Sequence, residues 1–322
     1  MNRAALSSQT GCNPFARVHG DAASRIWTGL TLGSTLVILG ILALILGNIA
    51  WNGLPGLSFR FLISGADKDM FDVEKAGVLP MIVGTAARVI LMSLFVIPIG
   101  VVTAIYLNEY AKSTSKLTRF IRAAVNNLAG VPSIVFGLFG LGFFIHFAGG
   151  SLDLLLNPKN SEPVWGKPGI LWASLTLAVM TMPLVIVATE ESLKAITPGL
   201  RDASLALGAT KLETIRKVVL PQALPGILTG GILAVSRASG EVAPILFTGA
   251  AYYMAHYPHS LSDQFMDLGY HVFILSTQSP NIDQTRPILY ATVLALLLLT
   301  FTLNIMAILL RAKIRKGMRA GH

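Results

Sequence analysis

Two opposite charges lie close together in a stretch of the sequence that is otherwise apolar. Arg237 and Glu241 are four residues apart in the run SRASGEVAP, a spacing that places both side chains on one face of a helix. An arginine at the centre of a bilayer costs about 2.5 to 3.5 kcal/mol on insertion scales. Pairing with Glu241 recovers part of that cost, and a role in binding an ion or a substrate would justify the rest.

The planar fork of Arg237 suits a tetrahedral oxyanion, because it can donate two parallel hydrogen bonds. Glu241 lowers the local positive charge, so an anion bound beside the pair would be held weakly enough to leave again, as transport requires. The alternative is structural: the pair locks its helix to a neighbouring helix. The residue types leave both interpretations open.

Two further residues are candidates for contact with an anion. Arg88 either snorkels to the nearer interface or makes the first contact with an incoming anion. Ser133 follows Gly130-Val131-Pro132, which would loosen a helix and free backbone N–H groups that can face an anion. A packing kink explains this break equally well. We place Ser133 with Arg237 and Glu241 in a candidate substrate pathway.

The composition indicates the elements that position these residues. Hydrophobic residues make up 53% of the 322 residues and charged residues 13%, which is too few charges to cover a soluble protein. Apolar stretches of the length that a bilayer requires occur six times, which predicts an all-α, polytopic membrane protein. The expected spans lie within 26–59, 79–108, 123–152, 168–189, 218–236 and 287–310, with Pro287 in the first turn of the last span. Residues 262–280 are expected to form an external loop with a short surface helix.

The basic residues predict the orientation of the chain. Seventeen of the 25 Lys and Arg residues fall in the N-terminal tail, in 109–122, in 190–217 or after Leu310, and six fall on the opposite side. The positive-inside rule therefore puts both termini in the cytoplasm. The net charge of +9 is a topology signal, so no nucleic-acid partner is expected. We expect 1–76 to hold the tail, the first span and an external loop, 77–310 the core, and 311–322 a basic cytoplasmic tail.

The cytoplasmic loop at 190–221 has the pattern of two short helices. Pro198 suits the first position of one helix, which Gly208 then ends. Thr210 and Glu213 predict a capping box that begins the second helix, and Pro221 is expected to end it. Such a loop either lies as an amphipathic helix on the membrane surface or fits a groove on a soluble partner.

This loop resembles the EAA motif of ABC-transporter permeases, in which Glu-Ala-Ala and a later Gly precede an aliphatic-x-Leu-Pro ending. The matching residues are Asp202, Ala203, Ser204, Gly208, Leu220 and Pro221. Asp replaces the Glu of the motif, and Ser replaces its second Ala. The resemblance implies that these residues dock in a cleft of a cytoplasmic ATPase subunit and transmit its motion to the spans.

Four other segments are similar to the phosphate permeases of the Pst system. They are SRASGEVAPILFTG, NNLAGVPSIVFGLFG at 126–140, IGVVTAIYLNEYA at 99–111 and TQSPNIDQTRP at 277–287. The APILFTG that follows the Arg-Glu pair favours the A-type subunit over its C-type partner. The resemblance covers residues 77–310 and implies the type I ABC importer permease fold (MetI-like). Within that family the positions of Arg237 and Glu241 are associated with the passage of phosphate.

The resemblance also implies an assembly in a bacterial inner membrane. Its other members would be a second homologous permease, a dimer of cytoplasmic ATP-binding subunits, and a periplasmic or lipid-anchored phosphate-binding protein. The sequence has no P-loop motif, so the chain is expected to be a transporter subunit and not an enzyme, and to borrow its ATPase. No cofactor or metal is expected. Cys12 is the single cysteine, which excludes an internal disulfide and a cysteine metal cluster.

Three alternatives keep some of these features. A permease for molybdate or sulfate would keep the loop and change the cargo. A proton-coupled carrier would use Arg237 and Glu241 as a proton relay and would need no ATPase. A membrane-embedded enzyme would need a nucleophile, a base or a metal cluster within the spans, and the apolar stretches contain none of these.

Overall fold

The computed structural model of this chain describes residues 22–65, 71, 77–112, 114–156, 162–254 and 256–320. Over these residues the chain is helical, and its β-structure consists of an isolated bridge between Ala250 and Phe265. Cys12 lies outside the described residues. The described residues from 22 to 49 belong to one unit, and the described residues from Ala50 onward belong to another.

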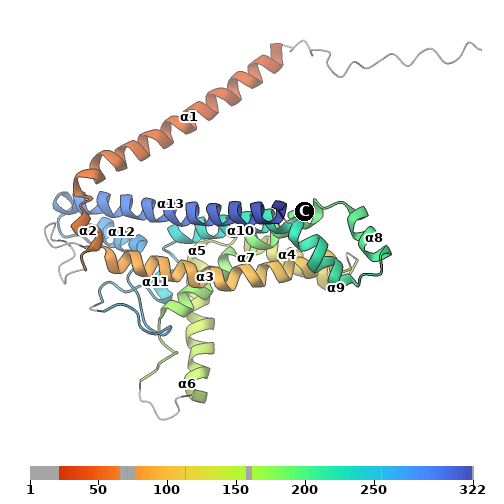
Figure 1. Cartoon of the computed structure of the whole chain (residues 1–322). Helices are drawn as coiled ribbons and strands as arrows, with labels where there is room; N and C mark the ends of the chain where they lie inside the picture. Colours follow the sequence, from red (N-terminus) through yellow and green to blue (C-terminus); the bar gives the residue numbers. More distant parts are fainter. Residues whose placement is uncertain are drawn as a thin grey trace, which may run out of the picture. The chain divides into compact units, whose positions relative to one another are not determined.

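Helices account for the whole architecture (Figure 1). The α-helices are α1 (Ala22–Gly53), α2 (Phe59–Ile63), α3 (Leu79–Ile105), α4 (Lys116–Leu128), α5 (Ser133–Phe139), α6 (Gly150–Leu156), α7 (Ile170–Lys194), α8 (Pro198–Ala206), α9 (Lys211–Thr214), α10 (Leu220–Gly240), α11 (Ile245–Thr248), α12 (Leu268–Thr277) and α13 (Ile282–Ala320). A 3-10 helix, η1 (Leu54–Gly56), and three π-helical segments, η2 (Tyr106–Tyr110), η3 (Gly140–Gly149) and η4 (Ile215–Val219), connect some of them.

Six helical segments within the described residues are long and apolar enough to cross a membrane, which confirms the predicted number of spans. They are Ser24–Gly56, Leu79–Tyr110, Ser133–Leu156, Ile170–Lys194, Lys211–Gly240 and Ile282–Lys316. The third span begins at Ser133, inside the predicted window of 123–152, and extends four residues beyond it to Leu156. Residues 116–128 form the separate amphipathic helix α4, and the span begins at Ser133 because Pro132 cannot continue α4.

Two predicted roles of proline are wrong. Pro221 does not end a helix, because the π-helical turn η4 comes directly before it and Pro221 falls in the first turn of α10, where its missing N–H costs little. One continuous segment therefore runs from Lys211 to Gly240. Pro287 lies inside α13, which begins five residues earlier at Ile282.

Helix α7 forms the centre of the second unit, packed between α3 and α10. In the most apolar stretch of α7, 67% of the residues are buried. The corresponding share is 28% for the α3 span and 33% for the α10 span. Glycines allow this close packing. A Cβ on Gly100 of α3 would lie 2.8 Å from the Val185 side chain of α7, and a Cβ on Gly230 of α10 would lie 2.7 Å from Ala188.

The α8–α9 loop and α12 lie at opposite ends of the helices in this unit (Figure 1). Helices α8 and α9 are at one end, together with the C-terminal ends of α3, α7 and α13. Helix α12 is at the other end, beside the N-terminal end of α3 and the C-terminal end of α10. Helix α12 was expected to be a surface helix, and this expectation is wrong. Its residues Leu268, Ile274 and Leu275 are buried, because α12 packs against α13 and α3.

Candidate functional site

Arg237 and Glu241 form an ion pair at the C-terminal end of α10. The Arg237 Nε atom lies 3.4 Å from Glu241 Oε1, and 41% of the Arg237 side chain and 23% of the Glu241 side chain are exposed. Glu241 is the residue that caps α10, with an extended backbone, so the pair straddles the end of the helix. A cation in the last turn of a helix is stabilised by the helix dipole, and this position suits Arg237.

The exposure of Arg237 bears on its two interpretations. A structural lock to a neighbouring helix of this chain would bury the guanidinium, as a buried charge requires a partner that excludes water. Arg237 is instead exposed, and within the described residues its ionic partner is Glu241, four residues further along the chain. The guanidinium is therefore accessible to a group from outside this chain.

Ser133, the third predicted pathway residue, is the first residue of α5 and is half-buried. Helix α5 packs against the segment that follows Glu241: a Cβ on Gly137 would lie 3.1 Å from Pro244 Cα and 3.2 Å from Ala243 O. The helix that begins at Ser133 therefore contacts the residues that directly follow the ion pair in the sequence. Within the described residues, no hydrogen bond joins Ser133 to Arg237 or to Glu241.

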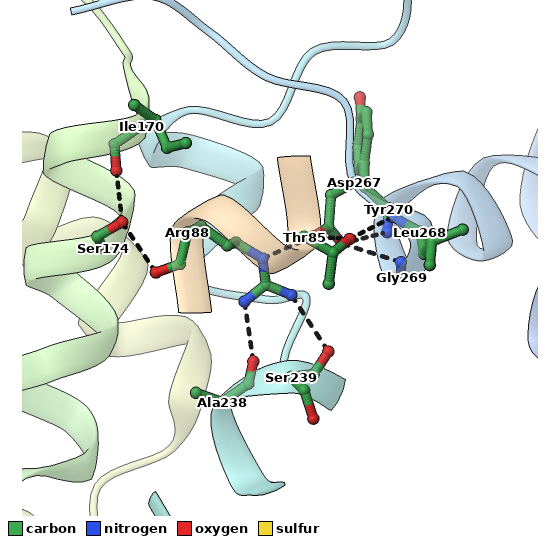
Figure 2. A network of polar contacts seen from close by, with 10 residues as sticks. All are labelled: Thr85, Arg88, Ile170, Ser174, Ala238, Ser239, Asp267, Leu268, Gly269 and Tyr270. Atoms are coloured by element: carbon green, nitrogen blue, oxygen red, sulfur yellow. Dashed lines mark hydrogen bonds and ion pairs between the residues drawn. The ribbon is translucent and has the colours of Figure 1, made fainter. Parts of the chain in front are cut away.

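Arg88 forms the most deeply buried charged network of the described residues (Figure 2). Its side chain and that of Asp267 are both fully buried, and Arg88 Nε donates to Asp267 Oδ2 at 2.6 Å. Arg88 Nη1 donates to the carbonyl oxygen of Ala238 at 2.8 Å, and Nη2 donates to that of Ser239 at 3.2 Å. Arg88 therefore joins α3 to the last turn of α10 and to the start of α12.

Asp267 is the N-cap of α12. Its Oδ1 atom accepts hydrogen bonds from the backbone N–H groups of Gly269 at 2.9 Å and Tyr270 at 3.2 Å. Its Oδ2 atom accepts from Thr85 at 2.9 Å as well as from Arg88, and the Thr85 hydroxyl oxygen in turn accepts from Leu268 N. Every oxygen of this buried carboxylate thus has donors, which a buried charge requires.

Both interpretations of Arg88 made from the sequence are wrong in this structure. A fully buried guanidinium neither snorkels to an interface nor meets an incoming anion. The sequence indicates that Asp267 is an N-cap, because it directly precedes the apolar run Leu268-Gly269-Tyr270, but it does not indicate that Arg88 is its partner. Buried arginines require a carboxylate partner, and Asp267 supplies it.

His271, in the same helix α12, carries no charge. Its side chain is buried, and burial lowers the pKa of His271 to about 4. The charged groups around the end of α10 include Arg88, Asp267, Arg237 and Glu241.

The loop that follows α7 has the predicted two-helix form. Helix α8 begins at Pro198, and α9 begins with the complete capping box of Thr210 and Glu213. Between them Gly208 has φ +85°, in the left-handed region. Gly208 N donates to Leu205 O and Ala209 N donates to Ser204 O, which is the pair of hydrogen bonds of a Schellman motif.

The six residues that match the EAA pattern divide into two groups. Asp202 and Ala203 on α8 are exposed, and Gly208 is exposed beyond its end. Ser204 is half-buried, and its hydroxyl lies 2.9 Å from that of Thr214, which joins α8 to α9. Leu220 and Pro221 lie at the start of α10, within the continuous segment Lys211–Gly240. They are half-buried, and Leu220 packs on the cluster of Leu193, Ile196, Val219, Ala223 and Ile227.

Arg201, the residue before the EAA position, holds the loop to the helical core. Its Nη2 atom donates to Glu109 Oε1 and to Leu193 O, and its Nη1 atom donates to Ile196 O, at 2.8 to 2.9 Å. Lys211 donates to the backbone oxygen of Glu109 and lies over the ring of Tyr110. Sequence reasoning did not identify Arg201 or Glu109 as functional, because they are 92 residues apart.

The comparisons with known proteins give a family. A family model described as "binding-protein-dependent transport system inner membrane component" matches residues 97–318. This range includes Arg237, Glu241 and the whole α8–α9 loop.

Several curated proteins are similar over most of their length. The chain is 32% identical to the "probable ABC transporter permease protein YqgI" of Bacillus subtilis over 224 residues, 70% of this chain and 69% of that one. It is 30% identical to "phosphate transport system permease protein PstA 1" of Mycobacterium tuberculosis, over 73% of this chain and 70% of that one. It is 32% identical to "phosphate transport system permease protein PstC" of Mesorhizobium japonicum, over 66% of each.

Solved structures of ABC transporters share the fold. A bacterial alginate transporter, in complex with its alginate-bound periplasmic protein, matches with a TM-score of 0.57 at 15% identity, over 89% of this chain and 95% of that chain. The methionine transporter MetNI, in an inward-facing conformation, matches with a TM-score of 0.51 at 20% identity, over 74% and 94%. At these identities the likeness concerns the fold alone. It confirms the predicted type I importer permease fold.

Proposed function

We propose a cargo and a mechanism for this chain, which belongs to the family of binding-protein-dependent transport system inner membrane components. It is a multi-pass membrane protein with six apolar helices, and a permease subunit rather than a catalytic chain. The proposed cargo is inorganic phosphate, which enters the cell past Arg237 and Glu241. The partly exposed, singly paired guanidinium of Arg237 is the observation that carries this proposal.

The choice of phosphate rests on chemistry and on similarity together. A guanidinium offers a fork of N–H donors that matches two oxygens of a phosphate ion. Relatives at 30 to 32% identity are named as phosphate permeases. Their names include both the A-type and the C-type subunit, and the APILFTG run after Glu241 favours the A-type for this chain.

Glu241 sets how tightly the anion is held. A lone arginine in a poorly solvated pathway would bind phosphate strongly and release it slowly, whereas conduction requires a site that the ion can leave. Glu241 Oε1 lies 3.4 Å from Arg237 Nε, which is a loose ion pair. The arriving phosphate competes with this carboxylate for the guanidinium, and Glu241 takes the guanidinium back when the phosphate leaves. We also place Ser133 at the edge of the pathway, because α5 packs against the segment after Glu241.

The α8–α9 loop is the proposed contact with an ATP-binding subunit. Asp202, Ala203 and Gly208 are exposed, as a docking surface requires, and Leu207 is 90% exposed at its tip. The connection from this surface to the membrane-spanning helix begins at Ser204, whose hydroxyl lies beside that of Thr214. It continues through Leu220 and Pro221 within the segment Lys211–Gly240. A displacement of α8 would therefore be transmitted through Ser204 and Thr214 to the continuous helix Lys211–Gly240, near whose end Arg237 lies.

The remaining partners follow from this arrangement. A second permease subunit would face the exposed side of Arg237 and complete the pathway, and a binding protein would deliver phosphate at the end of the helices where α12 lies. Two ATP-binding subunits would dock at the α8–α9 end. The excess of basic residues in the cytoplasmic loops and tails supports, by the positive-inside rule, our proposal that this end faces the cytoplasm and that both chain termini are cytoplasmic.

Uptake measurements test the cargo and the energy source. The chain is expressed with the genes for the proposed second permease, ATP-binding subunit and binding protein in a strain that lacks its own phosphate importers. Uptake of radioactive phosphate should be saturable, should be unaffected by a tenfold excess of sulfate, and should stop when ATP is depleted while the proton gradient is kept. Uptake of sulfate or molybdate in preference to phosphate would overturn the cargo. Uptake that persists without ATP would favour a proton-coupled carrier.

A further inference from the structure

The buried network of Arg88 and Asp267 touches the two backbone carbonyls that directly follow Arg237 (Figure 2). Resting on the proposed function, we propose that Arg88 and Asp267 are positioning residues for the anion site. They fix the last turn of α10 and thereby the direction in which Arg237 and Glu241 face.

The end of a helix is the place where its backbone is least constrained. The last four carbonyl groups of an α-helix have no partner within the helix and fray unless something binds them. In α10, which ends at Gly240, two of these carbonyls, those of Ala238 and Ser239, accept hydrogen bonds from Arg88. Arg88 therefore supplies from α3 the donors that would have come from a following helical turn.

This contact lies between the two residues of the anion site. Arg237 precedes Ala238 directly, and the backbone N–H of Glu241 donates to the same Ala238 oxygen that Arg88 holds, at 3.3 Å. A displacement of the Ala238 carbonyl would therefore move both members of the ion pair. In enzymes an error of about 1 Å in placing a group can change a rate by about a hundredfold, and we expect the passage of phosphate beside Arg237 to depend on position in the same way.

Asp267 compensates the buried charge of Arg88 and connects it to α12. Arg88 and Asp267 are both 0% exposed, and a lone arginine at this depth would be uncompensated. The carboxylate neutralises it, so the network adds no net charge beside Arg237 and leaves the strength of the anion site to Arg237 and Glu241. Asp267 also caps α12, so it ties the end of α10 to a helix that packs on α13.

The guanidinium of Arg88 does not touch the cargo in this arrangement, because it is fully enclosed. Its Nε, Nη1 and Nη2 atoms donate to Asp267, Ala238 and Ser239 respectively. Its role is therefore distinct from that of Arg237, and substitutions of the two should have different kinetic effects.

The test uses the whole transport complex in proteoliposomes, with uptake rates expressed per assembled complex. Arg88→Lys keeps the charge but replaces a planar fork with a single ammonium, which cannot reach all three acceptors with the same geometry. The double variant Arg88→Met with Asp267→Asn leaves no uncompensated buried charge, and an asparagine can still cap α12. Ile274→Ala is the matched control, since it weakens the packing of α12 without touching the network.

We expect both network variants to assemble and to lower the maximal rate of phosphate uptake per complex by about tenfold to a hundredfold. The Ile274→Ala complex should keep its rate per complex within about twofold, even if less of it assembles. Network variants with lower yield but normal rate per complex would show a purely structural role and overturn the proposal. If Arg88→Lys fails to assemble, the uptake rate per complex of the double variant decides between the positioning role and a purely structural role.

A third arm separates this inference from the proposed function. If Arg237→Gln abolishes uptake while the double variant transports normally, Arg237 remains the anion site and the positioning role is wrong. If Arg237→Gln transports normally, the proposed function itself fails.

Discussion

Arg201 donates a hydrogen bond to Glu109 at 2.9 Å and so fastens the start of the α8–α9 loop to the end of the α3 span. The pair is mostly buried, with 20% of the Arg201 side chain and 9% of the Glu109 side chain exposed. Arg201 also binds two carbonyls at the end of α7. The α8–α9 loop, which we propose as the contact with an ATP-binding subunit, is thus anchored to the α3 span and to α7, and it is also continuous with α10.

Loss of this anchor should uncouple ATP hydrolysis from transport. In Arg201→Ala, α8 keeps its own helix but loses its ties to Glu109 and α7, so we expect phosphate uptake to fall by about tenfold while ATP hydrolysis by the complex continues. Both rates are measured on the same purified complex. Arg216→Ala, an exposed arginine on the following segment, is the control. Equal losses of hydrolysis and uptake would show a defect in docking instead.

The turn between α8 and α9 depends on a conformation that most residues avoid. Gly208 has φ +85°, where a β-branched residue is strained by about 1 to 2 kcal/mol and asparagine is tolerated. Gly208→Val should therefore disturb the loop and reduce ATP-driven uptake several-fold, whereas Gly208→Asn should keep most of it. Equal activity of the two variants would mean that the shape of this turn is not needed for coupling.

Close packing of α3 against the segment before α12 predicts a stability effect. A Cβ on Gly84 would collide with the backbone oxygen of Met266, and backbone can give way less than a side chain. Gly84→Ala should destabilise the chain by about 1 to 3 kcal/mol, seen as a lower midpoint of thermal unfolding in detergent. Gly142→Ala is the matched control, because the space around Gly142 is open. A larger loss in Gly142→Ala would contradict the described packing.

The counter-charge at the anion site predicts a change in affinity. Glu241→Gln removes the carboxylate that competes with phosphate for Arg237, so the KM for uptake should fall and the maximal rate should fall with it, by about tenfold each. Initial rates over a range of phosphate concentrations give both values. A raised KM would mean that Glu241 helps to bind the cargo, for example by accepting a proton from it.

The sequence was sufficient for the spans and for the loop, because their signals are local. Apolar length predicted six spans, and the capping box of Thr210 and Glu213 and the turn at Gly208 are contained in a few neighbouring residues. The errors at Pro221 and Pro287 concern helix boundaries. Each proline was expected at a helix end, which is its usual place. A π-helical turn comes before Pro221 instead, and α13 begins before Pro287.

The long-range contacts could not be predicted in the same way. Arg88 and Asp267 are separated by 179 residues, and Arg201 and Glu109 by 92. Nothing local states which of several carboxylates a buried arginine will meet. That Arg88 caps the end of α10 is also invisible in the sequence, because its acceptors there are backbone carbonyls, which every residue possesses. The exposed ion pair was found because both of its members lie in one short run.

The central claim is that phosphate passes Arg237, and phosphate uptake by the purified complex in proteoliposomes tests it most directly. Arg237→Gln removes the charged fork and should lower the rate per complex by about a hundredfold or more, with assembly retained, while Arg60→Gln, an exposed arginine on α2, should leave it unchanged. Arg237→Lys should lie between them, because it keeps the charge without the fork. Uptake by Arg237→Gln at the unsubstituted rate would contradict the account.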